Sequence, residues 1–224
     1  MILAAGRGER MRPLTDATPK PLLRVRGQPL IERHVIGLAR SGIERIVINL
    51  AWLGSQIREY LGDGTRYGAA ITYSEESPRA LETAGGIFRA LPHLSPGPFA
   101  VVNGDIYTNF PFQELAVAGD QDAHLVLVPN PPQHPQGDFG LEAGLALAET
   151  ASATGSPTGN PAYRYTFAGI ATYRSAFFAE CTDGVFPLKP LLLRSMAAKR
   201  CSAQLYTGLW EDVGSPERLQ ALNA

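Results

Sequence analysis

The alternation of apolar runs with helical patterns constrains the fold of this chain more than any other feature. Residues 43–50 (IERIVINL) form the kind of apolar run that strands buried on both faces require. Leu53, Ile57 and Leu61 then share one face of a helix, because they follow one another at intervals of four residues. This β/α alternation predicts an α/β fold of three layers, in which helices cover both faces of a mostly parallel, Rossmann-like sheet. The expected strands are residues 1–5, 43–50, 70–74, 99–103, 123–128 and 165–173, and the expected helices are residues 29–40, 53–61, 83–91, 188–199 and a short one after the N-cap Ser215.

Composition limits the number of domains and the kind of partner. The chain has 224 residues, enough for one large domain, and 45% of them are hydrophobic. The net charge of −1 argues against a protein that coats nucleic acid or a membrane surface. No apolar run reaches the roughly 18 residues of a membrane span and no signal peptide opens the chain, so we expect a cytoplasmic location. Met1 already lies within the first expected strand, and we expect that a few residues which would extend this strand are missing.

The two cysteines, Cys181 and Cys201, lack metal-ligand spacing. Their spacing favours reduced thiols over a disulfide.

A basic loop follows the first expected strand. In this loop Gly6 and Gly8 can adopt a positive φ, so that successive N–H groups can point at one phosphate oxygen. Residues 6–26 carry six basic side chains and two acidic ones, an excess that suits a triphosphate. On composition alone, a phosphate loop and a solvated basic loop are equally open.

A family resemblance becomes specific at this loop. Residues 3–15 (LAAGRGERMRPLT) and 19–22 (PKPL) resemble the signature of sugar-1-phosphate nucleotidyltransferases. The molybdenum-cofactor guanylyltransferases share the opening but lack the Arg-Pro-Leu-Thr and Pro-Lys-Pro-Leu parts. The resemblance implies a single domain of nucleotidyltransferase type over residues 1–224. Residues 1–130 would bind a nucleoside triphosphate, and residues 131–224 would bind a sugar 1-phosphate.

The resemblance also assigns roles within the loop. Arg10 would bind the β- and γ-phosphates, and Lys20 would reach the α-phosphate, where charge builds in the transition state. Both are therefore catalytic candidates. The nucleotide would further contact Leu3, Ala4, Ala5, Gly6 and Gly8.

Two aspartates form a candidate Mg²⁺ site. Asp105 follows Asn103 at the carboxyl end of the strand FAVVN, the end that faces the ligand crevice in open α/β sheets. An aspartate at that place is often only a turn residue. However, residues 210–214 (WEDVG) resemble the family's Trp-x-Asp-x-Gly segment, which supplies a second metal ligand through Asp212. Two carboxylates, phosphate oxygens and waters suit Mg²⁺, and Asn103 would lie beside the nucleotide.

The base pocket shows a departure from the family pattern. Residues 81–86 (LETAGG) resemble the stretch that lines this pocket, usually Leu-Gly-Thr-Ala-Gly, and Glu82 replaces the glycine. The departure resembles the branch that transfers UMP to N-acetylmuramate 1-phosphate. A glutamate can accept the N3–H of uracil or the N1–H of guanine. Glu76 is the candidate for that contact, with a solvated loop acid as the alternative, and Thr83 and Gly85 complete the expected pocket.

The sugar side of the site is less defined. Residues 137–139 (GDF) and 166–170 (TFAGI) resemble the same branch, as do residues 49–54 (NLAWLG) and 62–64 (GDG). The family's Glu-Lys-Pro lysine, which contacts the sugar phosphate, is missing from residues 143–162. We expect residues 143–161 to be irregular or a weak hairpin. The sugar-phosphate cation is therefore unassigned, and the candidates on this side are Asp138, Gly169, Arg164 and, for the cation, also Lys189.

The function that follows is formation of UDP-N-acetylmuramate from UTP and N-acetylmuramate 1-phosphate with release of pyrophosphate, a reaction of cell-wall recycling. The alternative enzyme is a mannose-1-phosphate guanylyltransferase. A nucleotide-sugar sensor with a dead site is a third interpretation, although it would be expected to lose Arg10, Lys20 or a metal aspartate. We expect a monomer or a weak homodimer, with no nucleic-acid or membrane partner.

Overall fold

The computed structural model describes residues 1–76, 80–115, 119–148 and 164–224. The helices are α1 (Leu14–Ala17), α2 (Leu30–Arg40), α3 (Gly54–Leu61), α4 (Glu82–Ala90), α5 (Lys189–Ala197) and α6 (Pro216–Asn223). Short 3-10 helices are η1 (Glu9–Met11), η2 (Lys20–Leu22), η3 (Thr65–Tyr67), η4 (Leu91–His93), η5 (Phe112–Glu114) and η6 (Ser175–Phe178). The strands are β1 (Ile2–Leu3), β2 (Arg24–Val25), β3 (Gln28–Pro29), β4 (Arg45–Leu50), β5 (Ala70–Glu75), β6 (Phe99–Asn103), β7 (Ile106–Thr108), β8 (Ala123–Val128), β9 (Phe139–Glu142), β10 (Leu145–Leu147), β11 (Arg164–Tyr173), β12 (Cys201–Leu205) and β13 (Trp210–Asp212).

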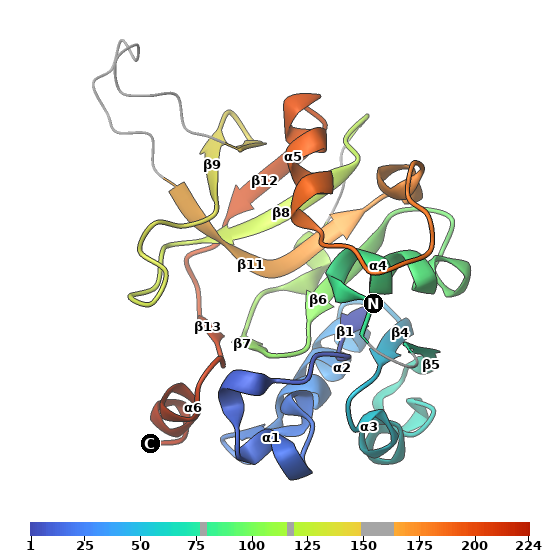
Figure 1. Ribbon diagram of the computed structural model, residues 1–224, viewed down its shortest axis with the longest axis vertical. Coiled ribbons are helices and arrows are strands. Elements are labelled where there is room, and N and C mark those ends of the chain that lie inside the picture. Colours follow the sequence, from blue (N-terminus) through green and yellow to red (C-terminus); the bar gives the residue numbers. More distant parts are fainter. Residues whose placement is uncertain (77–79, 116–118, 149–163) are drawn as a thin grey trace.

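A large mixed sheet runs through the molecule (Figure 1). Within the described residues its strand order is β5-β4-β1-β6-β11-β8-β12-β10-β9. The β5-β4-β1-β6 half is parallel throughout. In this half Leu3 is level with Asn49 on one side and with Asn103 on the other. The carboxyl ends of these strands therefore meet at one edge of the sheet.

The prediction of a mostly parallel sheet is wrong for the other half. Strand β11 runs antiparallel to both β6 and β8, and β11, β8, β12, β10 and β9 close into a small barrel. Parallel neighbours need a crossover of a dozen or more residues, usually a helix. Between β8 and β11 the described chain instead forms a β9–β10 hairpin with a turn at Ala143 and Gly144, both at positive φ.

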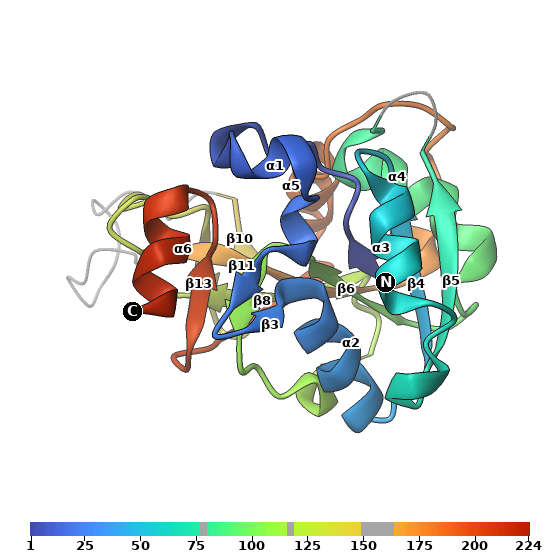
Figure 2. The same ribbon diagram turned by 90° about the horizontal axis from the view of Figure 1, so that it is seen from below.

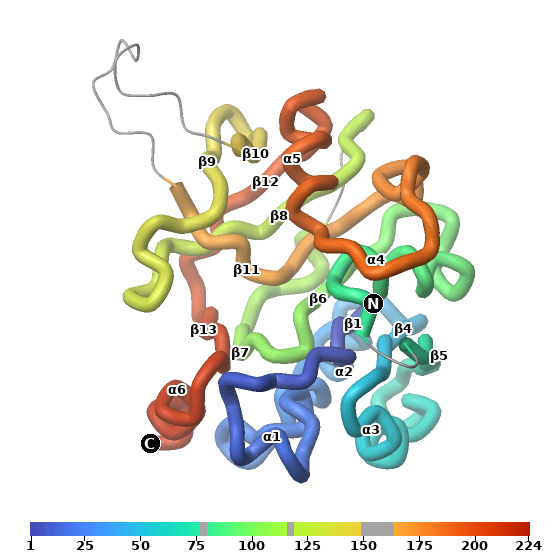
Figure 3. Tube along the Cα trace, viewed as in Figure 1, coloured from blue at the N-terminus to red at the C-terminus, as the bar shows by residue number. Residues whose placement is uncertain are grey.

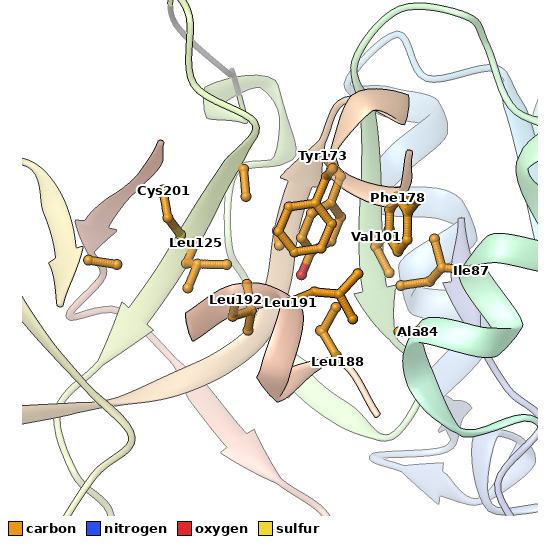
Figure 4. Packing of buried hydrophobic residues seen from close by; sticks show 14 of the residues in the cluster. Ala84, Ile87, Val101, Leu125, Tyr173, Phe178, Leu188, Leu191, Leu192 and Cys201 are labelled. Carbon is orange, nitrogen blue, oxygen red and sulfur yellow. The ribbon is translucent and has the colours of Figure 1, made fainter. Parts of the chain in front are cut away.

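Helices cover both faces of the sheet, as predicted. On one face, α2 and α3 pack Ile31, Val35, Leu38, Ile57 and Leu61 against the sheet. On the other face, Figure 4 shows α4 and α5 around the aromatic side chains of β11 and η6. There Ile87 packs near Phe178 and Val101, and Leu188, Leu191 and Leu192 lie together on one side of Tyr173. These two cores give the three layers.

A third, smaller core joins the two ends of the chain. Met11, Leu23, Val25, Leu30, Tyr107 and Val213 are buried together, with Leu219 and Leu222 of α6 packed against them. Asn223 of α6 accepts a hydrogen bond from the Arg26 N–H at 2.7 Å and donates to the Arg24 carbonyl at 3.1 Å. Figure 2 accordingly shows α6 and β13 beside the β2–β3 hairpin, and Figure 3 shows the C-terminus at the end of α6. This core holds the loop after β1 against the β7–β13 ladder, which lies next to Asp105 and ends at Asp212.

The strongly patterned elements were predicted well, and the short ones were missed. Strands β6 and β8 match their predicted bounds, and Ser215 caps α6 by accepting from the Arg218 N–H. Short elements such as β7, β10 and β13 carry too few residues for a periodic signal. Of the expected irregular segment, residues 143–147 belong to the β9–β10 hairpin, and residues 149–161 lie outside the described residues. Within the described residues, no helix is both long and apolar enough to cross a bilayer.

Candidate active site

A cavity lies at the carboxyl ends of the parallel strands. It has a volume of about 240 Å³ and combines the glycine-rich loop, the start of α4 and the end of β6. Its lining brings together most of the residues predicted for the nucleotide and the catalytic lysine. These are Leu3, Ala4, Ala5, Gly6, Gly8, Lys20, Glu76, Glu82, Thr83, Asn103 and Asp105, joined by Pro21, Asn49 and Ala80.

A second cavity of about 380 Å³ adjoins the first, and the two share Asn103 and Asp105. The predicted residues Arg10, Gly169 and Asp212 line this second cavity. The other lining residues are Ile106, Pro131, Gln133, His134, Thr166, Phe167, Ala168, Trp210 and Arg218. Two ligands bound in these cavities would therefore meet at Asp105.

The glycine-rich loop presents unused backbone donors to the first cavity. In the described part of the chain, no group accepts a hydrogen bond from the N–H groups of residues 5–8. Gly8 adopts a φ of 68°, and a Cβ there would press on Thr15 and Lys20, so no larger residue fits without strain. Consecutive N–H groups of this kind form an anion-binding concavity.

Among the six basic side chains of residues 6–26, all of them described, Arg10 alone has no hydrogen-bond or ion-pair partner. Arg7 stacks on Trp52, with its guanidinium carbon 3.6 Å from the ring centroid, and donates to the Thr15 carbonyl. Arg7 and Arg12 both pair with Asp16, which lowers the pKa of Asp16. The excess positive charge of the loop is thus partly neutralised, and Arg10 is the cation left for a ligand.

Lys20 and Asp105 form an ion pair where the cavities meet. The Lys20 Nζ lies 2.5 Å from Asp105 Oδ2, and the side chains are 9% and 34% exposed respectively. The pair joins η2, which follows the loop, to the turn after β6. A buried ammonium with one carboxylate partner can still donate to a phosphate oxygen.

Asp212 lies next to this pair across a short antiparallel ladder. Strand β13 pairs with β7 so that Asp212 is opposite Ile106, and the Val213 N–H donates to the Asp105 carbonyl at 3.2 Å. Asp212 Oδ2 accepts from Arg218 Nη1 at 2.8 Å. Each aspartate therefore keeps one carboxylate oxygen with no hydrogen bond to the described residues.

These two carboxylates fit the predicted metal. The donor set is all oxygen, which suits Mg²⁺, and Mg²⁺ commonly uses one or two carboxylates while waters and phosphate oxygens complete its shell. Within the described residues, no group of three or more His, Cys, Asp or Glu side chains could hold an ion without such help. The site thus resembles one that binds metal together with a phosphate ligand.

Glu76 and Glu82, the residues predicted to lie beside the base, both line the first cavity. Glu76 is buried and accepts from Asn49 Nδ2 at 2.6 Å and from the Leu81 N–H at 2.7 Å. Asn49 in turn accepts from the Ala4 N–H at 2.8 Å, so one chain of hydrogen bonds joins the glycine-rich loop to α4. Glu82 has a φ of 59°, in the left-handed region that favours glycine. This backbone conformation therefore explains why the family usually has glycine at this position.

Three predicted site residues do not line either cavity. Gly85 lies within α4, where its N–H donates to the Phe186 carbonyl at 3.2 Å. Asp138 accepts from the Phe167 N–H at 2.8 Å and contacts His134 at 3.1 Å. Arg164 donates to the carbonyls of Ala148 and Asp138. The side chains of Asp138 and Arg164 join segments that lie beside the second cavity, and Lys189 is absent from its lining.

Sequence reasoning missed several lining residues. The motif that contains Asn49 indicates no role for this residue, although its amide joins two parts of the site. Arg218 belongs to a short terminal helix with an ordinary charged pattern, which does not mark it as a site residue. The WEDVGSPER context could have pointed to it, since a helix capped by Ser215 returns Arg218 towards Asp212.

Comparison with known proteins decides the family. The sequence profile described as "Nucleotidyl transferase" matches residues 1–224. The chain belongs to the nucleotidyl transferase family. This nucleotidyl transferase is 48% identical over 230 residues to the N-acetylmuramate alpha-1-phosphate uridylyltransferase of Neisseria meningitidis serogroup B, with 100% of this chain and 96% of that protein covered. The protein of the same description from Caulobacter vibrioides is 32% identical over 237 residues, covering 100% of this chain and 95% of its own length.

A solved structure supports the fold. A putative glucose-1-phosphate thymidylyltransferase from Bacillus anthracis matches with a TM-score of 0.81 and 21% identity, covering 99% of this chain and 92% of that one. At that identity the likeness shows the fold alone. The prediction of a nucleotidyl transferase fold is thereby confirmed.

Proposed function

We propose that this nucleotidyl transferase makes UDP-N-acetylmuramate from UTP and N-acetylmuramate 1-phosphate and releases pyrophosphate. The observation that carries the proposal is full-length similarity at 48% identity to an uridylyltransferase for that sugar phosphate. The two adjoining cavities, with Lys20 and Asp105 at their junction, supply a site suited to two phosphate substrates. This similarity favours UMP transfer over GMP transfer, and Glu82 is compatible with it.

The geometry supports direct displacement. UTP would occupy the first cavity, with its phosphates on the free N–H groups of residues 5–8 and its base towards Glu76, Glu82 and Thr83. The sugar phosphate would enter the second cavity, and one of its oxygens would attack the α-phosphorus in line. Lys20 would stabilise the charge that develops there, and Arg10 would hold the departing pyrophosphate. No covalent nucleophile is required.

Asp105 and Asp212 would hold Mg²⁺ through their free carboxylate oxygens. Bound there, Mg²⁺ would supply charge neutralisation for the phosphate oxygens of both substrates. The protein's own part is to keep the two carboxylates next to each other through the β7–β13 ladder. Lys20 and Arg218 each balance one of their charges.

The proposal also assigns the two substrates to different parts of the chain. The first cavity is lined only by residues between 3 and 105, and the second draws mainly on residues 103–218. This supports a nucleotide-binding part over 1–130 and a sugar-phosphate-binding part over 131–224 within one domain. A cytoplasmic location and a monomer or weak homodimer remain predictions.

The test is pyrophosphate release from UTP, dTTP and GTP crossed with N-acetylmuramate 1-phosphate, mannose 1-phosphate and glucose 1-phosphate. We expect the highest kcat/KM for UTP with N-acetylmuramate 1-phosphate. Better turnover of GTP with mannose 1-phosphate would establish the guanylyltransferase instead. Binding of UTP without any pyrophosphate release in the presence of Mg²⁺ would support the dead sensor.

A further inference from the structure

The second cavity must receive an anion beside two aspartates, and few cations are available to attract it. A sugar 1-phosphate is a dianion at neutral pH, and Asp105 and Asp212 already contribute two negative charges to this lining. Among the described residues that line this cavity, only Arg10 and Arg218 carry guanidinium groups, and there is no lysine. The remaining basic side chain of the lining, His134, faces Asp138 at 3.1 Å, so the two guanidinium groups are the candidates for binding the dianion.

Asp212 holds Arg218 in place but engages only one nitrogen of its guanidinium group. Its Nη1 donates both to the Asp212 carbonyl and to Asp212 Oδ2, each at 2.8 Å. Its Nε and Nη2 have no hydrogen-bond acceptor among the described residues. A Cβ at position 214 would collide with Nη2, so Gly214 leaves the room in which the guanidinium lies. Nε and Nη2 can therefore donate to two oxygens of one phosphate while Nη1 stays hydrogen-bonded to Asp212.

Other cations on this side are unsuited to the same task. Arg164 donates to the carbonyls of Ala148 and Asp138, and it does not line the cavity. Lys189 begins α5, on the face of the sheet where α4 also packs, and it is absent from the lining. Arg10 follows the glycine-rich loop that would hold the triphosphate.

We infer that Arg218 binds the phosphate group of the sugar substrate and couples it to Asp212. The inference rests on the proposed function, because it takes the ligand of the second cavity to be a sugar 1-phosphate. Other family members contact the sugar phosphate with a lysine that this chain lacks. The inference assigns that contact to Arg218 of α6. A single guanidinium would thus fix the attacking phosphate with respect to a metal-binding carboxylate. A planar fork can do this and an ammonium group cannot, so Arg218→Lys should restore little.

The experiment compares the parent with Arg218→Gln and Arg218→Lys, using UTP and N-acetylmuramate 1-phosphate. The matched control is Lys189→Gln, which removes one positive charge outside the cavity. Loss of a charge-assisted contact predicts that the KM for the sugar phosphate rises about 10- to 100-fold in Arg218→Gln, with the KM for UTP changed less than about threefold. Calorimetric binding of the sugar phosphate to protein that holds a non-hydrolysable UTP analogue should weaken to the same extent. Lys189→Gln should match the parent.

Melting temperatures and Mg²⁺ titrations separate this role from a structural one. If Arg218 only orients Asp212, both variants should need more Mg²⁺ and lose UTP affinity in parallel, and the inference is overturned. An active parent whose sugar-phosphate KM and binding are unchanged in Arg218→Gln would also overturn it, while leaving the proposed function intact. A parent that turns over none of the sugar phosphates would overturn the proposed function and the inference together. If Arg218→Gln does not fold, the same criteria apply to Arg218→Lys.

Discussion

Lys20 Nζ lies 2.5 Å from Asp105 Oδ2 at the point where the two cavities of the site meet. The lysine side chain is nearly buried, and its carboxylate partner is one third exposed. The pair therefore spans from the nucleotide cavity to the place where a second substrate would arrive. Since Asp105 Oδ1 has no hydrogen bond to the described residues, the aspartate can bind a metal ion while it is paired with Lys20.

The first prediction concerns Lys20→Ala. We expect kcat to fall by roughly 10²-fold or more with only a modest change in UTP affinity, because a charge aimed at the transferring phosphoryl group acts mostly in the transition state. Steady-state kinetics with UTP as the varied substrate measure both constants. Arg24→Ala, which removes an exposed cation that donates to the Gly27 carbonyl and lies over the Tyr60 ring, is the control. A near-normal kcat in Lys20→Ala would leave the lysine a purely structural role.

The second prediction compares Asp105→Asn with Asp212→Asn in the absence of metal. Two acids that face each other would be expected to repel, and either substitution would then stabilise the metal-free protein. In this structure, however, Asp105 is paired with Lys20 and Asp212 with Arg218. Asp105→Asn leaves the buried Lys20 ammonium without a charge partner and should cost about 1–3 kcal/mol of unfolding free energy. Asp212→Asn should cost less than about 1 kcal/mol, because the pair is partly exposed and Arg218 retains the Asp212 carbonyl.

Urea unfolding in EDTA measures this difference, and both variants should lack turnover when Mg²⁺ is restored. Asp183→Asn serves as the control, since its pair with Arg89 is on the surface and away from both cavities. Equal losses of stability in the two site variants would show that Lys20 does not depend on Asp105. A metal-free Asp105→Asn protein that is more stable than the parent would contradict the ion-pair account.

Some parts of the site could be predicted because they lie at the carboxyl ends of buried strands. Leu3, Asn103 and Asp105 could be placed because buried parallel strands are recognisable and their carboxyl ends converge. Asp212 came from a family motif, since a three-residue strand such as β13 has no pattern of its own. Asn49 acts through a hydrogen bond to Glu76, 27 residues away, and the sequence contains no signal for such a partner. Arg218 lies six residues from Asp212, and the Ser215 cap is its one local signal.

The mixed half of the sheet escaped prediction for a related reason. An apolar strand such as β8 looks the same whether its neighbour runs parallel or antiparallel. Direction is set by the connection, and the β9–β10 hairpin depends on a turn at Ala143 and Gly144 that no strong local pattern announces. A β/α alternation therefore predicts the parallel half and says little about the strands that follow it.

The third prediction uses the backbone of Glu82. At a φ of 59° a non-glycine residue bears a strain of about 1 kcal/mol, which glycine would relieve at some entropic cost in the unfolded state. We expect Glu82→Gly to be as stable as the parent or slightly more stable. We also expect its preference for UTP over GTP, measured as the ratio of kcat/KM, to fall about tenfold, the effect of losing one contact to the base.

Ala143→Gly is the matched control for this variant. Ala143 has a φ of 49° in the β9–β10 turn and lines neither cavity, so the same relief of strain should leave nucleotide preference unchanged. Thermal unfolding and nucleotide competition are measured on both proteins. An unaltered nucleotide ratio in Glu82→Gly would mean that the glutamate does not discriminate between bases.

The last prediction rests on a buried histidine beneath the site. The His34 ring is fully buried on α2, and its Nε2 lies 2.9 Å from the Ile106 carbonyl, next to Asp105 in sequence. Since a carbonyl only accepts, Nε2 carries the proton and Nδ1 has no partner. Burial lowers the pKa of His34 to about 4, although the Ile106 hydrogen bond and the charge of Asp105 oppose the shift. The folded protein thus holds this imidazole neutral at pH values where the unfolded chain would protonate it.

Between pH 6.5 and about 4, the unfolded state therefore binds more protons at this position than the folded state. The free energy of unfolding should decrease as the pH falls through this window, by as much as about 3 kcal/mol from His34 alone, and His34 should add no further slope below it. Glutamine can donate to the Ile106 carbonyl and does not titrate. Urea unfolding of the parent and of His34→Gln at pH 7.5, 6, 5 and 4 should show a smaller loss of stability in the variant, with the difference confined to this window. Equal pH dependence in the two proteins would mean that His34 titrates alike in the folded and unfolded states, contrary to its burial.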